Sequence, residues 1–426
     1  MLDIKLIREH PEIVKANLEK RRDDEKKTWI DKLLHIDKEW RAIKSEVDGL
    51  RHERNDVSQQ INKTKKDGGD IKPLLEKAKA IPKQIDDLEG KAALLQRKIR
   101  HYLMRLPNIM HESVPYGKDD TENQEIRKEG KINKPGFELK NHVELGENLG
   151  VLDFDRSAKT SGAGFYFLKG DLALLNQALI RFAIEFLVKR GYHYTEPPLM
   201  LNKDVYEGVT DLADFENVMY KIDGEDTYLI ATSEHPLVSQ FKDETFNAEE
   251  LPIKLAGYSM CFRREIGSHG IDTKGLYRTH QFNKVEQVII CTPDQGWKLH
   301  EEILKNTEDM FNALEIPFRV VNICTGDLGI IAAKKYDVEA WFPRRQEYGE
   351  VASCSHYTDY QARRLNIKML DKNNNRVVAH TLNNTGIATS RTLVAIMENF
   401  QNKDGTITIP KVLVPFMMGK TKIGGK

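Results

Sequence analysis

Apolar residues spaced alternately four and three positions apart run through two long stretches near the N-terminus of this chain. The first stretch is formed by Trp29, Leu33, Ile36, Trp40, Ile43, Val47, Leu50, Val57 and Ile61. The second is formed by Leu74, Ala78, Ile81, Ile85, Leu88, Ala92, Leu95, Ile99, Tyr102 and Leu106. The segment KKDGGD at 65–70 separates them, and its glycines interrupt a helix. This heptad spacing predicts an antiparallel helical hairpin, a coiled-coil arm over about 29–106 with legs roughly 55 Å long.

Two residues inside the arm depart from the pattern. Arg54 occupies a position of the seam that an apolar residue would normally fill. Pro82 lies within the second leg, where its missing N–H removes a helix hydrogen bond. We therefore expect a kink or a local break of the second helix at Pro82.

The tip of the arm is basic. Between Ile61 and Lys83 there are seven lysines and three acidic residues, although the whole chain contains 65 basic and 65 acidic side chains. Because the chain has no net charge, a nucleic acid would have to be met by such a local patch. A spacer or dimerisation coiled coil with a solvated tip is the alternative, and the charge pattern alone leaves both open. The candidate phosphate-binding lysines are Lys63, Lys65, Lys66 and Lys72.

The bulk composition restricts the class of protein. A chain of 426 residues can form two or three domains. Its four cysteines occur singly, which predicts neither a disulfide framework nor a structural zinc site and is typical of a reducing compartment. The N-terminus is charged within three residues, and the most apolar helix candidate contains Arg181 and Glu185. We therefore expect a soluble, cytoplasmic protein without a membrane partner.

The composition changes after LPNIMHESVPYG at 106–117. Polar sequence with scattered glycines follows over 118–150, and helical patterns then alternate with short apolar runs. The helices are expected at 172–190, 295–314, 326–335 and 388–402. Because strands and helices do not alternate one for one, the pattern predicts an α+β domain with an antiparallel sheet flanked by helices. The predicted domains are 1–110, which includes the arm, and 111–426.

One segment of the second domain, FRREIGSHGIDTKGLYRTHQFNKVE at 262–286, carries charges on expected strands. Alternate residues of a strand share a face, so Arg263 and Glu265 should point the same way. Arg278, Phe282 and Glu286 should share one face of the next strand. Such groups form exposed salt bridges in some sheets, but gathered on one surface they also suit a nucleotide with a small zwitterion. The chain has no P-loop and no glycine-rich dinucleotide motif, so ATP would bind on the sheet.

At this point the residues resemble a known family. The segment 262–286 is similar to motif 2 of the class II aminoacyl-tRNA synthetases, in their seryl-tRNA synthetase form. The resemblance covers nearly the whole chain in the same order, including the N-terminal hairpin. It implies a ligase that activates L-serine with ATP and transfers serine to the 3′ end of tRNA(Ser), with tRNA(Sec) as a further candidate substrate. The other segments that carry it are motif 1 (174–200), the serine-specific TxE loop (231–237), the EISSCS and DFQARR segments (347–364) and motif 3 (381–401).

The resemblance implies roles at the ATP site. Arg263 would hold the junction between the serine carboxylate and the α-phosphate. Glu265, Arg278 and Phe282 would bind ATP, with Phe282 stacked on the adenine. Arg391 would hold the β- and γ-phosphates, so Arg263 and Arg391 are the implied catalytic residues.

The serine pocket is implied in the same way. Thr232 and Glu234 would surround the amino group of serine. Glu286 and Thr385 would bond its hydroxyl, with Asn383 beside them. A pocket built to bond a hydroxyl rejects alanine, because its polar groups would then be left without partners.

The resemblance also implies Mg²⁺, bound with ATP and held by Glu350 and Ser353; no zinc is expected. This chain departs from the family's usual motifs at several positions. Ala352 replaces the first serine of EISS, and Asn384 and Ser390 replace glycines of motif 3. Smaller changes fall on Ser233, His235 and Thr385.

The implied partners are ATP, L-serine, tRNA(Ser) and a second copy of the chain. The arm would reach across this homodimer to the elbow and long variable arm of the tRNA, and the loop 267–275 would touch its acceptor end.

Three alternatives to this function are weighed. A threonyl or prolyl enzyme usually has a C-terminal anticodon-binding domain, whereas only about 25 residues follow motif 3 here. A paralogue without tRNA binding would lack the arm, and an inactive scaffold would not retain the arginines and carboxylates together.

Overall fold

The structure is a computed structural model that describes residues 1–211, 215–265 and 275–425. The chain divides into two compact units: one spans Leu2–Pro107, and the other spans Asn108–Lys426 together with Met1. Each unit is described by itself. Among the described helices, none is both long enough and apolar enough to cross a membrane.

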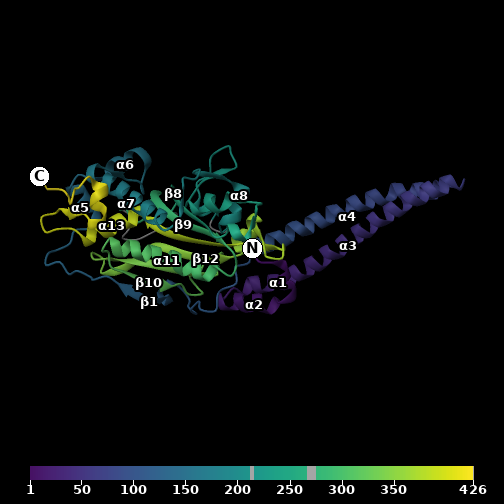
Figure 1. The fold of residues 1–426 in the computed structure, drawn as a ribbon, viewed down its shortest axis with the longest axis horizontal. Coiled ribbons are helices and arrows are strands. Elements are labelled where there is room, and N and C mark those ends of the chain that lie inside the picture. Colours follow the sequence, from purple (N-terminus) through teal and green to yellow (C-terminus); the bar gives the residue numbers. More distant parts are fainter. Residues whose placement is uncertain (212–214, 266–274, 426) are drawn as a thin grey trace. The chain divides into compact units, whose positions relative to one another are not determined.

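The N-terminal unit consists of four helices. Two short ones, α1 (Ile4–Glu9) and α2 (Pro11–Lys20), precede the two long ones, α3 (Asp24–Lys66) and α4 (Lys72–Arg105). The long helices run side by side as a hairpin (Figure 1), and the chain reverses direction between them at Asp67–Ile71. The helical hairpin predicted from the heptad spacing is therefore confirmed.

The seam between the long helices is apolar, as the spacing predicts. Val47 and Val57 of α3 are buried together with Ile81 and Ile85 of α4. Arg54, which interrupts the seam, is exposed. α4 continues as one helix through Pro82, so the local break considered there is absent.

The short helices pack on α3. The carboxylate of Asp37 is only 1 % exposed, and it accepts hydrogen bonds from Arg8 of α1 at 2.6 and 2.7 Å and from Arg41 at 3.0 Å. Because a buried carboxylate needs such partners, the ion pairs fix α1 against the base of the hairpin. The short helices α1 and α2 thus belong to the helical unit.

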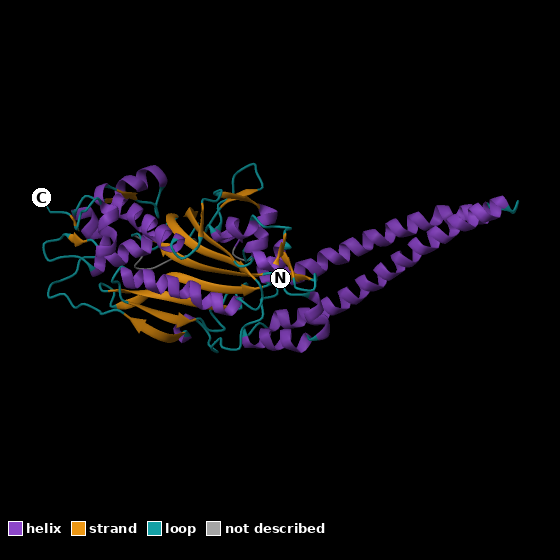
Figure 2. Cartoon of the chain, viewed as in Figure 1, coloured by secondary structure: helices purple, strands orange, loops and turns teal. Residues whose placement is uncertain are grey.

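The second unit is built on a large sheet, whose strands are orange in Figure 2. It has eight strands in the order β1-β10-β11-β12-β15-β9-β8-β4. All neighbouring strands are antiparallel except β4 and β8, which confirms the predicted α+β class. The strands are β1 (Gln124–Glu129), β4 (His193–Thr195), β8 (Ile253–Phe262), β9 (Gln281–Cys291), β10 (Phe318–Asn322), β11 (Lys334–Phe342), β12 (Glu347–Thr358) and β15 (His380–Ala388).

Three helices cover this sheet and complete its main core: α7 (Gly170–Val188), α11 (Gly296–Ala313) and α13 (Thr389–Asn399). Each lies where the helical pattern predicts one. The smaller elements are α5 (His142–Asn148), β2 (Leu152–Asp153), α6 (Phe154–Ser161), β3 (Phe167–Leu168), β5 (Met200–Asn202), α8 (Lys203–Val209), α9 (Phe215–Val218), β6 (Thr227–Leu229), α10 (Glu234–Ser239), β7 (Thr245–Asn247), α12 (Tyr360–Leu365), β13 (Lys368–Leu370), β14 (Arg376–Val378), β16 (Ile407–Thr408) and β17 (Lys422–Ile423).

The prediction of a helix at 326–335 is wrong. This segment forms turns and then enters β11 at Lys334. A Cβ on Gly326 would meet the carbonyl oxygen of Lys118 at 2.0 Å, so the chain packs closely against Lys118 at this point. The backbone N–H of Ala333 already donates to His356 of β12 at 2.8 Å. Pairing with distant strands therefore overrides the local helical pattern.

Candidate active site

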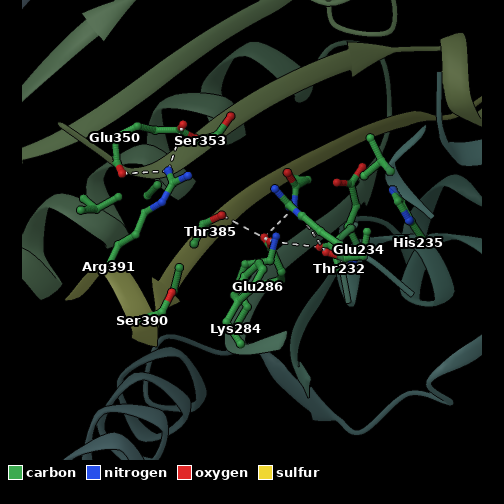
Figure 3. A pocket seen from close by; sticks show the side chains of 18 of the residues that line it. Thr232, Glu234, His235, Lys284, Glu286, Glu350, Ser353, Thr385, Ser390 and Arg391 are labelled. Atoms are coloured by element: carbon green, nitrogen blue, oxygen red, sulfur yellow. Dashed lines mark hydrogen bonds and ion pairs between the residues drawn. The ribbon is translucent and has the colours of Figure 1, made fainter. Parts of the chain in front are cut away.

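A cavity of about 380 Å³ opens on the central strands of the sheet. β9 contributes Lys284 and Glu286 to its lining, and helix α10 contributes Glu234 and His235. Other walls come from β12, β15 and the start of α13 (Figure 3), and from residues at 210, 218–219, 231–232, 263–265 and 277–279. The cavity collects all the predicted ATP, serine and metal residues: Thr232, Glu234, Arg263, Glu265, Arg278, Phe282, Glu286, Glu350, Ser353, Asn383, Thr385 and Arg391. The lysines Lys63, Lys65, Lys66 and Lys72 are exposed around the turn of the helical unit.

The strands that carry motif 2 are shorter than the sequence analysis expects. β8 ends at Phe262 and β9 begins at Gln281, so Arg263, Glu265 and Arg278 lie beyond the strand ends. Glu265 adopts a left-handed conformation with φ of 45°, and its carboxylate pairs with Arg278 at 3.5 Å. The prediction that these residues lie on a strand face is therefore wrong, but all three of them line the cavity. The loop 267–275 lies, except for Gly275, outside the described residues.

Glu286 lies at the floor of the cavity and is 1 % exposed. Its carboxylate accepts hydrogen bonds from the hydroxyls of Thr232 at 3.1 Å and Thr385 at 3.3 Å, and from the amide of Asn383 at 2.7 Å. The ammonium of Lys284 forms an ion pair with the same carboxylate. Donors from three separate segments of the chain therefore converge on one carboxylate.

Glu234 is a second buried carboxylate at this end of the cavity. It is 7 % exposed and accepts a hydrogen bond from the amide of Gln361 at 2.8 Å. Burial, reinforced by the nearby charge of Glu286, raises the pKa of Glu234 from 4.5 to about 7. The neighbouring His235 has its pKa lowered to about 3 by burial and by the cations Lys284 and Arg263, so it is neutral. Among the described residues, Glu234 forms no ion pair, so a cationic group of a ligand could bind to its carboxylate.

The opposite end of the cavity is held by Arg391, in the first turn of α13. Its guanidinium donates to the backbone carbonyl of Glu350 at 2.9 Å and to the carboxylate of Glu350 at 3.0 Å, and it lies 4.8 Å from the ring centre of Tyr277. Burial alone would raise the pKa of Glu350, but Arg391 and Lys335 outweigh it and hold that pKa below its ordinary value. Glu350 is therefore an anion at neutral pH.

Arg263 and Phe282 lie at the mouth of the same region. The guanidinium carbon of Arg263 is 5.3 Å from the ring centre of Phe282, a cation–π contact. A planar base stacked on Phe282 would thus lie next to a cation that can neutralise a phosphate.

The departures from the family's motifs do not all face the cavity. Asn384 is fully buried on the other side of β15, where its amide donates to Thr307 of α11 at 2.9 Å. Its neighbours Asn383 and Thr385 face Glu286 instead, because side chains alternate along a strand. Ser390 lines the cavity, as does Ala352, which pairs with Val338 of β11. Asn384 therefore joins β15 to helix α11, which covers the sheet.

Sequence reasoning missed several residues of the site. Lys284 lies two positions from both Phe282 and Glu286, so the alternation along β9 could have placed it on the same face. Gln361, which donates to Glu234, lies on α12 within the DFQARR segment, but the sequence analysis assigned it no role at the site.

Comparison with known proteins agrees with this geometry. Residues 218–400 match the model of the tRNA synthetase class II core domain (G, H, P, S and T), and residues 1–110 match the seryl-tRNA synthetase N-terminal domain. The serine–tRNA ligase of Methanoculleus marisnigri is 54 % identical over 421 residues, covering 98 % of this chain and 99 % of the relative.

Solved structures give the same result. The seryl-tRNA synthetase of Pyrococcus horikoshii complexed with ATP aligns with a TM-score of 0.94 at 47 % identity, covering 100 % of both chains. The cytoplasmic serine–tRNA ligase of Naegleria fowleri in complex with AMP aligns with a TM-score of 0.89 at 34 % identity, covering 100 % of this chain and 99 % of the other. With its core, its helical hairpin and its relatives in agreement over nearly the full length, this chain belongs to the seryl-tRNA synthetase family of class II aminoacyl-tRNA synthetases.

Proposed function

We propose that the cavity joins serine to ATP and that the same site then passes serine to a tRNA. The overall activity follows from the family: the chain is an enzyme that charges tRNA with serine. The observation that carries the site assignment is the polarity of the cavity. Carboxylates and hydroxyls gather around Glu286 at one end, and arginines line the other.

ATP occupies the arginine end in this proposal. Phe282 stacks on the adenine, and Glu265 and Arg278 contact the nucleotide beside it. Arg263 neutralises the α-phosphate, and Arg391 neutralises the β- and γ-phosphates. The Pyrococcus horikoshii relative was solved with ATP and the Naegleria fowleri relative with AMP, which supports a nucleotide site in this fold.

Serine occupies the carboxylate end. Its ammonium lies against Glu234 and Thr232, and its hydroxyl donates to Glu286 next to Thr385 and Asn383. An ammonium is the ligand group that fits best beside Glu234, because it supplies the positive charge that would hold this buried carboxylate ionised.

Class II synthetases use a divalent metal ion with ATP, and we assign that metal as Mg²⁺ held by Glu350 and Ser353. The test of fit is the donor set: a carboxylate kept anionic by Arg391 and a hydroxyl, both hard oxygen donors on one strand. When bound, Mg²⁺ neutralises charge on the phosphates that leave.

Adenylation requires no acid, base or nucleophile from the protein. The carboxylate of serine attacks the α-phosphorus in line, a C–O–P bond forms, and pyrophosphate leaves. Arg263 positions both reacting groups and stabilises the charge that develops on the α-phosphate, while Arg391 orients the leaving group. A ribose hydroxyl at the 3′ end of the tRNA then attacks the carbonyl carbon and displaces AMP.

The N-terminal unit supplies the tRNA contacts. We assign residues 1–110 as the tRNA-binding domain and 111–426 as the catalytic domain. The exposed lysines Lys63, Lys65, Lys66 and Lys72 bind the phosphate backbone of tRNA(Ser), which they position without reading its sequence. tRNA(Sec) is a further candidate substrate.

A second copy of the chain covers exposed apolar residues of the catalytic unit. Phe167, Leu174, Val188 and Met200 are each between 38 % and 48 % exposed and lie on β3, α7 and β5. Exposed apolar side chains in this number favour an interface, here between two copies in a homodimer. The four cysteines are free and buried, which suits the reducing cytoplasm that we propose as its compartment.

The experiment that tests the site is ATP–pyrophosphate exchange without tRNA, with serine compared against threonine, alanine and glycine. We expect exchange with serine and at least about a hundredfold less with alanine, because Glu286 would lose its hydroxyl partner. Absence of exchange with serine in folded protein containing Mg²⁺ would overturn the proposal. Deleting residues 30–105 should abolish charging of tRNA and leave exchange intact; loss of both would make the arm structural.

A further inference from the structure

Lys284 is a residue of the cavity that the functions described so far do not use. It lies on β9 between Phe282 and Glu286 and is 7 % exposed. Its ammonium pairs with the carboxylate of Glu286, and Figure 3 shows the two side chains together beneath Thr232 and Thr385. A lysine buried to this extent in a ligand cavity requires an explanation, because an ammonium loses most of its hydration there.

The charges around Lys284 come from several elements. Glu286 shares its strand, and Glu234 and the neutral His235 face it from α10. The guanidinium of Arg263 follows β8, and β15 presents only the neutral Asn383 and Thr385. The buried thiol of Cys261 on β8 also lies near Lys284, and the buried phenol of Tyr357 on β12 lies near Glu234; burial raises the pKa of both. Among the residues that the structure describes, the serine end thus contains the carboxylates of Glu234 and Glu286 and the ammonium of Lys284, with Arg263 nearby.

We propose that Lys284 is a positioning residue: its ion pair holds the Glu286 carboxylate beside the hydroxyls of Thr232 and Thr385, and its charge favours the anionic form of Glu234, so that the pocket accepts the hydroxyl and the ammonium of serine. This inference rests on the proposed function of the cavity. It assigns to Lys284 a role in selecting the substrate by charge, without contact with the reacting atoms.

The chemistry of serine explains why this charge matters. A carboxylate accepts hydrogen bonds only, whereas a protonated carboxyl also donates one. The hydroxyls of Thr232 and Thr385 and the amide of Asn383 already donate to Glu286, so its environment is arranged for an anion that accepts. A serine hydroxyl that donates to the same anion is selected over the methyl group of alanine.

Two buried carboxylates without a cation between them cannot both remain charged. The charge of Glu286 already opposes ionisation of Glu234, even with Lys284 present. Lys284 is one of the groups that lower the pKa of Glu234, so without it Glu234 would keep its proton to higher pH and would attract the ammonium of serine less. Replacing Lys284 should therefore change how kcat/KM for serine varies with pH.

The test compares K284M and K284R with the wild type in ATP–pyrophosphate exchange between pH 6 and 9. For K284M we expect the acidic limb of kcat/KM for serine to move upward by about one pH unit or more, with about a tenfold loss at pH 7 that high pH partly restores. K284R retains the charge and should follow the wild-type profile. KM for ATP should change less than about twofold, because the arginine end remains intact.

A double variant keeps the inference testable if K284M folds poorly. Glu286→Gln removes the charge that Lys284 balances, so adding K284M to E286Q should lower the melting temperature less than K284M lowers that of the wild type. An equal loss in both backgrounds, or a K284M profile with an unchanged acidic limb, would overturn the role of Lys284. A wild type that shows no serine-dependent exchange would instead overturn the proposed function itself, so the two failures are distinguishable.

Discussion

Arg391 donates from one nitrogen to both the backbone carbonyl and the side-chain carboxylate of Glu350, at 2.9 and 3.0 Å. This pair joins the first turn of α13 to β12 and holds the guanidinium at the edge of the cavity (Figure 3). The arginine is therefore oriented before any phosphate binds, and binding does not have to order a long side chain.

The first prediction concerns this orientation. Arg391→Lys keeps the charge but loses the planar fork, so we expect the rate of ATP–pyrophosphate exchange to fall by about 10² or more, and Arg391→Ala to fall further. The control is Arg376→Ala, which removes an exposed arginine of β14. Exchange by R391K at the wild-type rate would mean that a positive charge at this position is enough for activity and that the planar guanidinium is not required.

A second prediction concerns the stability of the fold. Glu234 has its pKa raised to about 7 by burial and by Glu286, so the folded chain retains a proton that the unfolded chain releases above about pH 4.5. The cost of ionising this carboxylate lowers stability as pH rises from 4.5 to 7 and is fully present above 7. Glu234→Gln should therefore be more stable than the wild type at pH 8, by on the order of 1–3 kcal/mol, and nearly unchanged at pH 4.

The same E234Q variant should lose most of its serine-dependent exchange, because the ammonium of serine would lose its carboxylate partner. Thermal melts at the two pH values, with exchange assayed at pH 8, check both statements. Equal melting temperatures for E234Q and the wild type at pH 8 would contradict the raised pKa.

A third prediction addresses the metal. Chelation with EDTA should abolish exchange, and Ser353→Ala should raise the Mg²⁺ concentration for half-maximal exchange by several-fold to about tenfold. Glu350→Gln should have a larger effect, since it also removes the partner of Arg391. Glu347→Gln, an exposed glutamate at the start of β12, is the matched control. An unchanged Mg²⁺ requirement in S353A would remove this residue from the metal site.

A fourth prediction concerns the tip of the arm. Replacing Lys63, Lys65, Lys66 and Lys72 with alanine should lower kcat/KM for tRNA by about 10² and weaken its dependence on salt, with exchange unchanged. A matched quadruple variant of exposed lysines elsewhere in the helical unit is the comparison: Lys5, Lys20, Lys32 and Lys38. If both variants charge tRNA equally well, the tip does not bind it.

A fifth prediction concerns acid stability. His300 of α11 and His356 of β12 are buried, and burial lowers the pKa of His300 to about 4 and that of His356 to about 2. Neither ring nitrogen of His356 has a hydrogen-bond partner among the residues that the structure describes. Because the unfolded chain takes up these protons near pH 6.5 and the folded chain does not, stability should decrease as pH falls below 6.5.

His356→Phe removes one of these titrations and keeps a ring against Trp297, whose centre lies 4.2 Å away. Its unfolding free energy should therefore fall less steeply between pH 6.5 and 5, by up to about 1.4 kcal/mol per pH unit. The exposed His193 provides the control, as His193→Gln. Parallel pH profiles for H356F and the wild type would argue against this account.

Much of the fold could be predicted from the sequence because two signals are local. The heptad seam specifies the hairpin, since each leg contacts the other along one stripe, and Arg54 is exposed where the stripe is interrupted. The helices around 172–190 and 295–314 likewise follow from their own apolar faces. The segment at 326–335 fails because its conformation depends on Lys118 and on β12, which are distant in sequence.

The candidate site shows the same division. Motif residues such as Glu286 and Arg391 could be named from the sequence, and the structure places them in one cavity. The true ends of β8 and β9 could not be predicted, because Arg263 and Arg278 continue the charge alternation past the last paired residues. The contact of Gln361 with Glu234 could not be predicted either, because no periodicity relates the two segments that it joins.

The order of strands in the sheet has a consequence for how this chain is synthesised. β9, which carries Glu286, lies between β8 and β15, and β15 is made almost ninety residues later (Gln281–Cys291 against His380–Ala388). The helical hairpin belongs to the compact unit Leu2–Pro107 and can form while the rest is still being translated. Until β15 leaves the ribosome, β9 and β12 each have a bare apolar edge. We therefore expect nascent chains that end before about residue 380 to aggregate through these edges, with the arm already folded.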